Sequence, residues 1–303
     1  MHVLVAGWFS FEEMGTTAGD LIARDIVCDW LKDSSASYEV AAIDKYALPG
    51  AVNWKNADST LYTDVIFVCG PFGNGWPVTD FLAHFSSSRF IGINLSMLQS
   101  LETWNPFTLL YERDSSRASN PDITFYSPAP KGSVVGVILA HKQKEYGAKS
   151  LHEIADDAIA ALLQNKEASV IHIDTALEEN KSGLRTPNEV ESLIAKMDMV
   201  ITTRLHGTVL AIKNGVPVIP IDPVAGGAKI TKQVHAIGWP ILLGAENLNV
   251  AELNNAYEYC LTAGASIKAK ACAESAYKKI EQIRHQFSED LAALAGKPIS
   301  RYV

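Results

Sequence analysis

Residues 197–222 read M-D-M-V-I-T-T-R-L-H-G-T-V-L-A-I-K-N-G-V-P-V-I-P-I-D. An apolar run, Met197–Ile201, precedes a short polar turn and a helical stretch that stops at Asn214-Gly215. A second apolar run, Val216–Ile221, closes the segment. This order predicts strand, loop, helix and strand, which is the repeating unit of an open α/β sheet. Because ligands of such sheets bind at the carboxyl ends of the strands, the turn after the first run is a candidate site.

Apolar runs alternate with amphipathic stretches along the whole chain, as in parallel sheets covered by helices on both faces. We expect strands at Val3–Ala6, Val40–Ile43, Val65–Cys69, Phe90–Asn94, Thr108–Tyr111, Val134–Leu139 and Val170–Ile173. We expect helices at Gly19–Leu31, from a Ser150/Glu153 capping box to Gln164, from Pro187 onward, and at Ala273–Leu294. A proline-rich stretch at 121–132 is typical of a linker. The sequence therefore predicts two open α/β domains, residues 1–131 and 132–303, that face each other across a cleft, and leaves open whether the last helix packs back on the first domain.

Composition restricts the classes of protein. The 303 residues suffice for two domains, and a formal net charge of -8 disfavours nucleic acid as the main partner. The amino terminus lacks the basic region of a signal peptide, and no run reaches the roughly 18 apolar residues of a membrane span. The four cysteines have no metal-ligand spacing, so we expect them to be reduced and buried, and we expect no metal or cofactor. A cytoplasmic protein is the simplest interpretation.

Arg204 and His206 share the turn after the 197–201 run, beside Gly207. A guanidinium suits phosphate or carboxylate, and a helix start offers free N–H groups to an anion. The positive helix end favours a neutral imidazole that can take or relay a proton, and Gly207 would let a ligand approach the backbone. The alternative is that Arg204 pairs with a structural carboxylate and His206 caps a helix or packs. His152 and His172 are expected on a helix surface and at a strand end.

Basic groups follow two other strands of the second domain. The loop that starts at Asp222 contains a Gly-Gly turn and then Lys229 and Lys232, and His141-Lys142 follow the first strand. Three such strand ends together favour an anionic substrate held between the domains. A plain surface loop with solvated lysines explains the Lys229 segment equally well.

Glycines mark two turns of the first domain. Gly19 and Asp20 lie at the start of the first helix, where Asp20 serves equally well as a helix cap. Gly70 and Gly73 follow a very apolar strand, which indicates either a close ligand or a tight turn. The pattern is not G-x-G-x-x-G, so dinucleotide binding is disfavoured.

In this order the motifs resemble the polysaccharide pyruvyl transferase family. Its R-L-H segment is similar to Thr203–Gly207 followed by Gly215–Ile219, and weaker likenesses lie at Gly19-Asp20, Gly70–Gly73, Tyr111–Ser116 and Pro128-Ala129. The resemblance implies a GT-B-like pair of Rossmann-type domains. It also implies transfer of a pyruvyl group from phosphoenolpyruvate to two hydroxyls of a sugar, in a polysaccharide or its precursor, to form a cyclic ketal.

The resemblance also implies roles for individual residues. Arg204 would hold the donor's phosphate or carboxylate, and His206 would transfer protons. From the residues themselves, we expect the second domain to bind the donor through Gly207, His141, Lys142, Asp222, Lys229 and Lys232. We expect the first to bind the acceptor, free or lipid-linked, through Gly19, Asp20, Gly70 and Gly73. The family often has an arginine where this chain has His141-Lys142, and lysine meets a phosphate only as a point charge.

Two other functions stay open at this point. A GT-B glycosyltransferase that uses a nucleotide sugar is disfavoured because no glutamate lies between Asp222 and Gly244. A non-catalytic relative that kept the fold is the other, since a fold does not imply a function.

Overall fold

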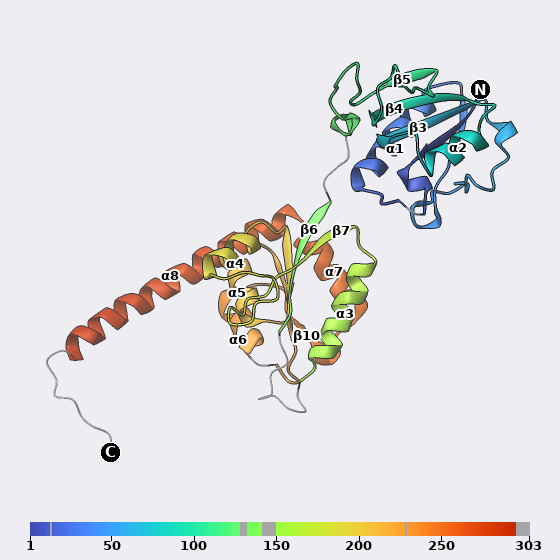
Figure 1. The fold of residues 1–303 in the computed structure, drawn as a ribbon. Coiled ribbons are helices and arrows are strands. Elements are labelled where there is room, and N and C mark those ends of the chain that lie inside the picture. The colour runs from blue at the N-terminus through green and yellow to red at the C-terminus, as the bar shows by residue number, and fades with distance from the viewer. Residues whose placement is uncertain (13, 128–131, 141–149, 228, 295–303) are drawn as a thin grey trace. The chain divides into compact units, whose positions relative to one another are not determined.

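The computed structural model describes residues 1–12, 14–127, 132–140, 150–227 and 229–294 (Figure 1). The chain forms two compact units, Met1–Pro130 and Lys131–Val303. Each contains one five-stranded sheet in which all pairs of neighbouring strands are parallel. The prediction of two open parallel-sheet units is confirmed.

The sheet of the first unit has the order β2-β1-β3-β4-β5. Its strands are β1 (His2–Gly7), β2 (Ser37–Val40), β3 (Asp64–Phe72), β4 (Arg89–Met97) and β5 (Leu109–Tyr111), and its helices are α1 (Ala18–Lys32) and α2 (Val78–His84). Successive β1 side chains are buried in two different clusters. Val3 and Val5 pack with α1, whereas Leu4 and Ala6 pack in an aromatic cluster with α2. Burial on both faces explains why β1 reads as one continuous apolar run.

The sheet of the second unit has the order β10-β9-β8-β6-β7. Its strands are β6 (Ser133–Ile138), β7 (Ala168–His172), β8 (Met199–Thr202), β9 (Val218–Asp222) and β10 (Leu243–Gly244). Its helices are α3 (His152–Gln164), α4 (Pro187–Ile194), α5 (Leu205–Lys213), α6 (Lys229–Ile237), α7 (Val250–Cys260) and α8 (Ala263–Leu294). The chain runs from β6 to β7 on one side and then to β8 on the other, so the strand order reverses between β6 and β8. Such a reversal opens a crevice at the carboxyl ends of the two strands.

Three sequence predictions differ from the structure. β2 ends at Val40, where a strand was expected to begin. The predicted capping box at the start of α3 is wrong, because the Ser150 hydroxyl contacts His152 Nδ1 at 2.7 Å and no side chain caps the helix. α8 begins ten residues earlier than expected, at Ala263, because its first turns are buried against the core through Ala265 and Ala269. Pro187 is the first residue of α4, as predicted.

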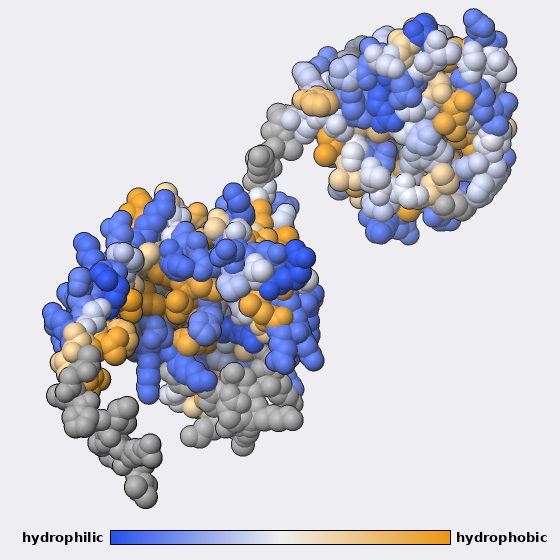
Figure 2. Space-filling view, turned by 60° about the vertical axis from the view of Figure 1, so that its left-hand side comes forward, coloured by the Kyte–Doolittle hydropathy of each residue, from blue (hydrophilic) through white to orange (hydrophobic). Residues whose placement is uncertain are grey.

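α8 contacts α5, α6 and α7 of its own unit. Its second half carries exposed large apolar side chains: Tyr277, Ile280, Ile283, Phe287, Leu291 and Leu294. Orange, hydrophobic atoms lie on the surface near this end of the chain in Figure 2. Within the described ranges, no helix has both the length and the apolar character needed to cross a membrane. All four cysteines are free and buried, as expected.

Candidate functional site

A cavity of about 290 Å³ lies at the carboxyl edge of the second sheet. Residues that follow β6, β7, β8 and β9 line it, together with the start of α6: Ala140, Thr175, Thr203, Arg204, Leu205, His206, Asp222, Pro223, Val224, Lys229 and Ile230. The cavity therefore occupies the crevice where the strand order reverses. Its wall contains the Arg204 and His206 side chains.

Hydrogen bonds from two threonines fix the turn that carries Arg204. Thr202 Oγ1 donates to the Ile138 carbonyl at 2.8 Å and accepts from the Arg204 N–H at 3.0 Å. Thr203 Oγ1 accepts from the Ala140 N–H at 2.8 Å. These bonds hold the ends of β6 and β8 together. Arg204 is the N-cap residue of α5, directly before the helix, and its backbone is extended.

Packing explains why residue 207 is a glycine. Gly207 does not line the cavity, and a Cβ atom there would collide with Thr202 Oγ1 and lie 3.1 Å from Ile138 Cγ2. The missing side chain therefore lets α5 pack closely on the sheet.

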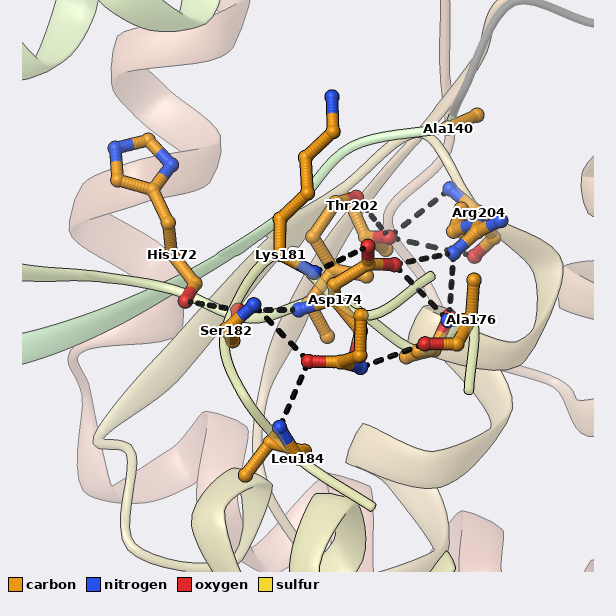
Figure 3. A network of polar contacts seen from close by, with 12 residues as sticks. Ala140, His172, Asp174, Ala176, Lys181, Ser182, Leu184, Thr202 and Arg204 are labelled. Carbon is orange, nitrogen blue, oxygen red and sulfur yellow. Dashed lines mark hydrogen bonds and ion pairs between the residues drawn. The ribbon is translucent and has the colours of Figure 1, made fainter. Parts of the chain in front are cut away.

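Arg204 is held by a carboxylate of its own unit (Figure 3). Its Nη1 donates to Asp174 Oδ1 at 2.9 Å and to Thr175 Oγ1 at 3.0 Å. The alternative considered for Arg204, pairing with a structural carboxylate, is therefore correct as far as this contact goes. The Arg204 side chain is nevertheless 22% exposed and lines the cavity. Nε and Nη2 donate to no group among the described residues, so part of the guanidinium remains available to an anion.

Asp174 organises the loop after β7, and sequence reasoning missed it. Its carboxylate accepts from the Ala176 N–H at 2.9 Å and from the Lys181 N–H at 3.3 Å, and its own N–H donates to Ser182 Oγ at 2.9 Å (Figure 3). The Asn180 amide donates to the Asp174 carbonyl at 2.8 Å. A carboxylate with several such donors is held rigidly, so Arg204 is held rigidly as well.

Asp222 lies in the cavity wall but acts as a backbone anchor. It is buried, and its carboxylate accepts from Thr231 N–H at 3.0 Å, Thr231 Oγ1 at 2.7 Å and Val224 N–H at 3.2 Å. These bonds fix the loop after β9 and the start of α6, which brings Lys229 to the cavity. Lys232 is exposed and does not line the cavity.

The histidines lie in different surroundings. His206 is exposed in the first turn of α5 and lines the cavity. His152 was expected on a helix surface, and this prediction is wrong: His152 is buried, and its burial lowers its pKa. His172 is exposed at the end of β7, as expected. His141 and Lys142 lie outside the described residues.

The glycine turns of the first unit are explained by packing. Gly70 has a φ of +86°, and a Cβ there would collide with the Trp8 indole; at Gly73 a Cβ would lie 2.9 Å from Leu98 Cδ1. Gly19 lies in the first turn of α1, where Asp20 Oδ2 accepts from the Thr17 N–H at 2.8 Å. The cap interpretation of Asp20 is confirmed. These geometries favour the tight-turn interpretation of Gly70 and Gly73.

The comparisons with known proteins bear on the segment that builds the cavity. Residues 116–223 match the family model for polysaccharide pyruvyl transferase. This segment is therefore similar to the polysaccharide pyruvyl transferase family over about a third of the chain. It contains the β6, β7 and β8 strand ends, Asp174, Arg204 and His206, and it ends just before Val224. The pyruvyl transferase match thus covers most of the cavity wall and stops short of Lys229.

Solved structures show distant likenesses over nearly the whole chain. The calicheamicin glycosyltransferase CalG4 has a TM-score of 0.37 at 12% identity, covering 98% of this chain and 99% of that chain. The spinosyn rhamnosyltransferase SpnG has a TM-score of 0.34 at 11% identity, covering 90% and 95%. UDP-GlcNAc 2-epimerase from Methanocaldococcus jannaschii has a TM-score of 0.33 at 11% identity, covering 87% and 93%. No curated protein matches the chain.

Proposed function

We propose that the chain is a pyruvyl transferase that moves the pyruvyl group of phosphoenolpyruvate to two hydroxyls of a sugar, in a polysaccharide or its precursor. One observation carries the proposal: Arg204 and His206 line the same cavity, within the segment that matches the family model. The guanidinium can bind the negative charge of a compact donor, and the imidazole can transfer the protons that the reaction moves.

The size and charge of the cavity support this donor. At about 290 Å³ it lies at the small end of ligand pockets, which commonly measure about 300–1,000 Å³. Arg204 and Lys229 contribute positive charge, and the first turn of α5, a helix end that favours anions, lines the same space. Phosphoenolpyruvate places a phosphate and a carboxylate on a three-carbon frame, so one small cationic cavity could hold both groups.

The reaction needs proton transfer as well as charge. Two acceptor hydroxyls lose their protons, and their oxygens form two C–O bonds to the central carbon of the donor. That carbon loses its bond to the phosphate oxygen. One proton goes to the methylene carbon, which becomes a methyl group, and the other balances the departing phosphate.

His206 is the residue we assign to these proton transfers. It is exposed to the cavity and is free to approach a bound ligand. One imidazole can act first as a base and then as an acid, with a rate effect of roughly 10²–10⁴. Arg204 and Lys229 would stabilise the charge that develops on the leaving phosphate.

The test is phosphate release from phosphoenolpyruvate in the presence of a sugar panel, with mass spectrometry to detect the ketal. We expect His206→Gln to lower turnover at least a hundredfold, with little change in phosphoenolpyruvate binding. His235→Gln is the matched control, because His235 is exposed on α6 and does not line the cavity. Near wild-type turnover in His206→Gln would reject the assignment.

A further inference from the structure

A second cavity, of about 350 Å³, lies next to the Arg204 cavity in the same unit. The two share Ala140, and Asp174, the partner of Arg204, lies in the wall of the second one. The other polar side chains of its wall come from α3, from the end of β7 and from the loop that Asp174 organises: Asp156, His172, Lys181 and Ser182.

Asp156 is the unusual group in this wall. Its Oδ1 is buried and accepts no hydrogen bond from any residue that the structure describes. Burial raises the pKa of this carboxyl, and the neighbouring Asp157 and Glu153 raise it further. A buried carboxylate oxygen without a donor destabilises the fold. A ligand that supplies an O–H or N–H group would remove that destabilisation.

Lys181 and His172 supply donors at the same cavity. Both side chains are exposed, and neither the ammonium nor the imidazole joins the hydrogen-bond network of Figure 3. Among the described residues, no hydrogen bond or ion pair engages either head group. The wall therefore contains an acceptor on α3 and donors on the β7 side.

We propose that this second cavity binds the polyhydroxylated sugar that accepts the pyruvyl group. This inference rests on the proposed function. Sugar hydroxyls donate and accept, so they suit a wall with the Asp156 carboxylate on one side and Lys181 and His172 on the other. The new C–O bonds also require the acceptor to lie beside the donor, and the shared Ala140 wall provides that proximity. The acceptor site then belongs to the second unit, with Asp156 as a binding residue.

The volume agrees with one sugar ring. A cavity of about 350 Å³ admits a single hexopyranose and a few waters. A longer glycan would have to extend out of the cavity, past the exposed Lys181 and His172 side chains. The class of ligand is therefore a hexose unit at the end of a glycan or its precursor.

The experiment is amide NMR on the full-length, isotope-labelled chain, with four probes: D-galactose, D-mannose, D-glucose and N-acetyl-D-glucosamine. We expect at least one hexose to shift the Ala140 and Ser182 amides. Asp156→Ala should weaken that hexose at least tenfold. Asp157→Ala is the matched control, because Asp157 is the exposed neighbour on α3 and does not line the cavity.

Lys181→Ala is a second variant, and we expect it to fold normally because the Lys181 side chain is exposed on a loop. It should weaken the same hexose severalfold. The inference is overturned if no hexose shifts these amides, or if Asp156→Ala and Asp157→Ala bind equally well.

Phosphoenolpyruvate, titrated into the same sample, separates this inference from the proposed function. Its binding should shift the Thr203 and Leu205 amides of the Arg204 cavity. A phosphoenolpyruvate response without any hexose response rejects the sugar subsite alone. A hexose response without a phosphoenolpyruvate response rejects pyruvyl transfer and leaves a sugar-binding cavity.

Discussion

Arg204 Nη1 donates to Asp174 Oδ1 at 2.9 Å, although the two residues are 30 positions apart in the chain. They follow β8 and β7, which are separated by β6 in the sheet. The pair joins the walls of the two cavities, because Arg204 lines one and Asp174 lines the other. The ion pair also fixes Nη1 of the guanidinium, whereas Nε and Nη2 remain available at the smaller cavity, which Arg204 lines.

Asp174→Asn tests whether this carboxylate organises the site. The asparagine amide has only one oxygen, so it cannot accept from both the Arg204 guanidinium and the Lys181 N–H. Its NH₂ group would face one of these two donors. We expect the free energy of unfolding of the second unit to fall by about 1–3 kcal/mol, measured by urea denaturation. Asp157→Asn, on the exposed face of α3, should have almost no effect. Equal unfolding free energies of the two variants would show that the Asp174 carboxylate does not organise the site.

Gly207→Ala tests the packing role of the glycine beside His206. The added methyl would collide with Thr202 Oγ1, and a helix packed against a strand cannot easily shift. We expect a loss of about 1–3 kcal/mol in unfolding free energy and a distorted Arg204 turn. Gly244→Ala is the control, because a Cβ there meets nothing within 4 Å. If Gly207→Ala is as stable as Gly244→Ala, close packing does not explain this glycine.

His152 should make the second unit less stable at mildly acidic pH. Its burial lowers its pKa below the ordinary value of 6.5, while the nearby Asp222 opposes that shift. The unfolded chain therefore binds a proton at this site more readily than the folded chain, so stability falls as pH drops below about 6.5. We expect His152→Leu to flatten the stability profile between pH 7 and 5, measured by thermal unfolding. His235→Gln, on an exposed residue, should leave the slope unchanged.

Glu112 should contribute to the acid sensitivity of the first unit. The hydrogen bond that Arg117 Nη2 donates to Glu112 Oε2, at 2.7 Å, lowers the pKa of this buried carboxyl to about 2. The contribution is complete above the ordinary pKa of about 4.5 and is lost as pH falls toward 2. We expect Glu112→Gln to cost about 1–3 kcal/mol at pH 7 and much less near pH 2. A cost that does not change with pH, or one matched by the exposed Glu102→Gln, would contradict this assignment.

Four of the five strands of the second sheet and the helices α3, α4 and α5 were predicted from the sequence, whereas β10, α6 and α7 were not. β8, α5 and β9 lie where the apolar runs and the Asn214-Gly215 stop signal placed them, because buried parallel strands need continuous apolar runs. The start of α8 was missed because alanines carry little periodic signal, although Ala265 and Ala269 are fully buried.

The site was only partly accessible to sequence reasoning. The strand-end rule found Arg204 and His206, and the same rule applied to the I-H-I-D-T stretch after β7 would have found Asp174. Gly207 and Gly70 could not be interpreted from sequence, because a glycine that admits a ligand and one that admits a neighbouring side chain look alike. The burial of His152 depends on contacts with the loop after β9, which no local pattern reveals.

The most direct test of the central claim is a calorimetric titration of phosphoenolpyruvate into the wild type, Arg204→Lys and Arg185→Lys. Arg185 is exposed before α4 and lies outside both cavities, so it controls for the loss of a guanidinium. We expect the wild type and Arg185→Lys to bind equally, and Arg204→Lys to bind at least tenfold more weakly, which corresponds to about 1.4 kcal/mol. No binding to the wild type, or equal binding to all three proteins, would contradict the assignment of the Arg204 cavity to this donor.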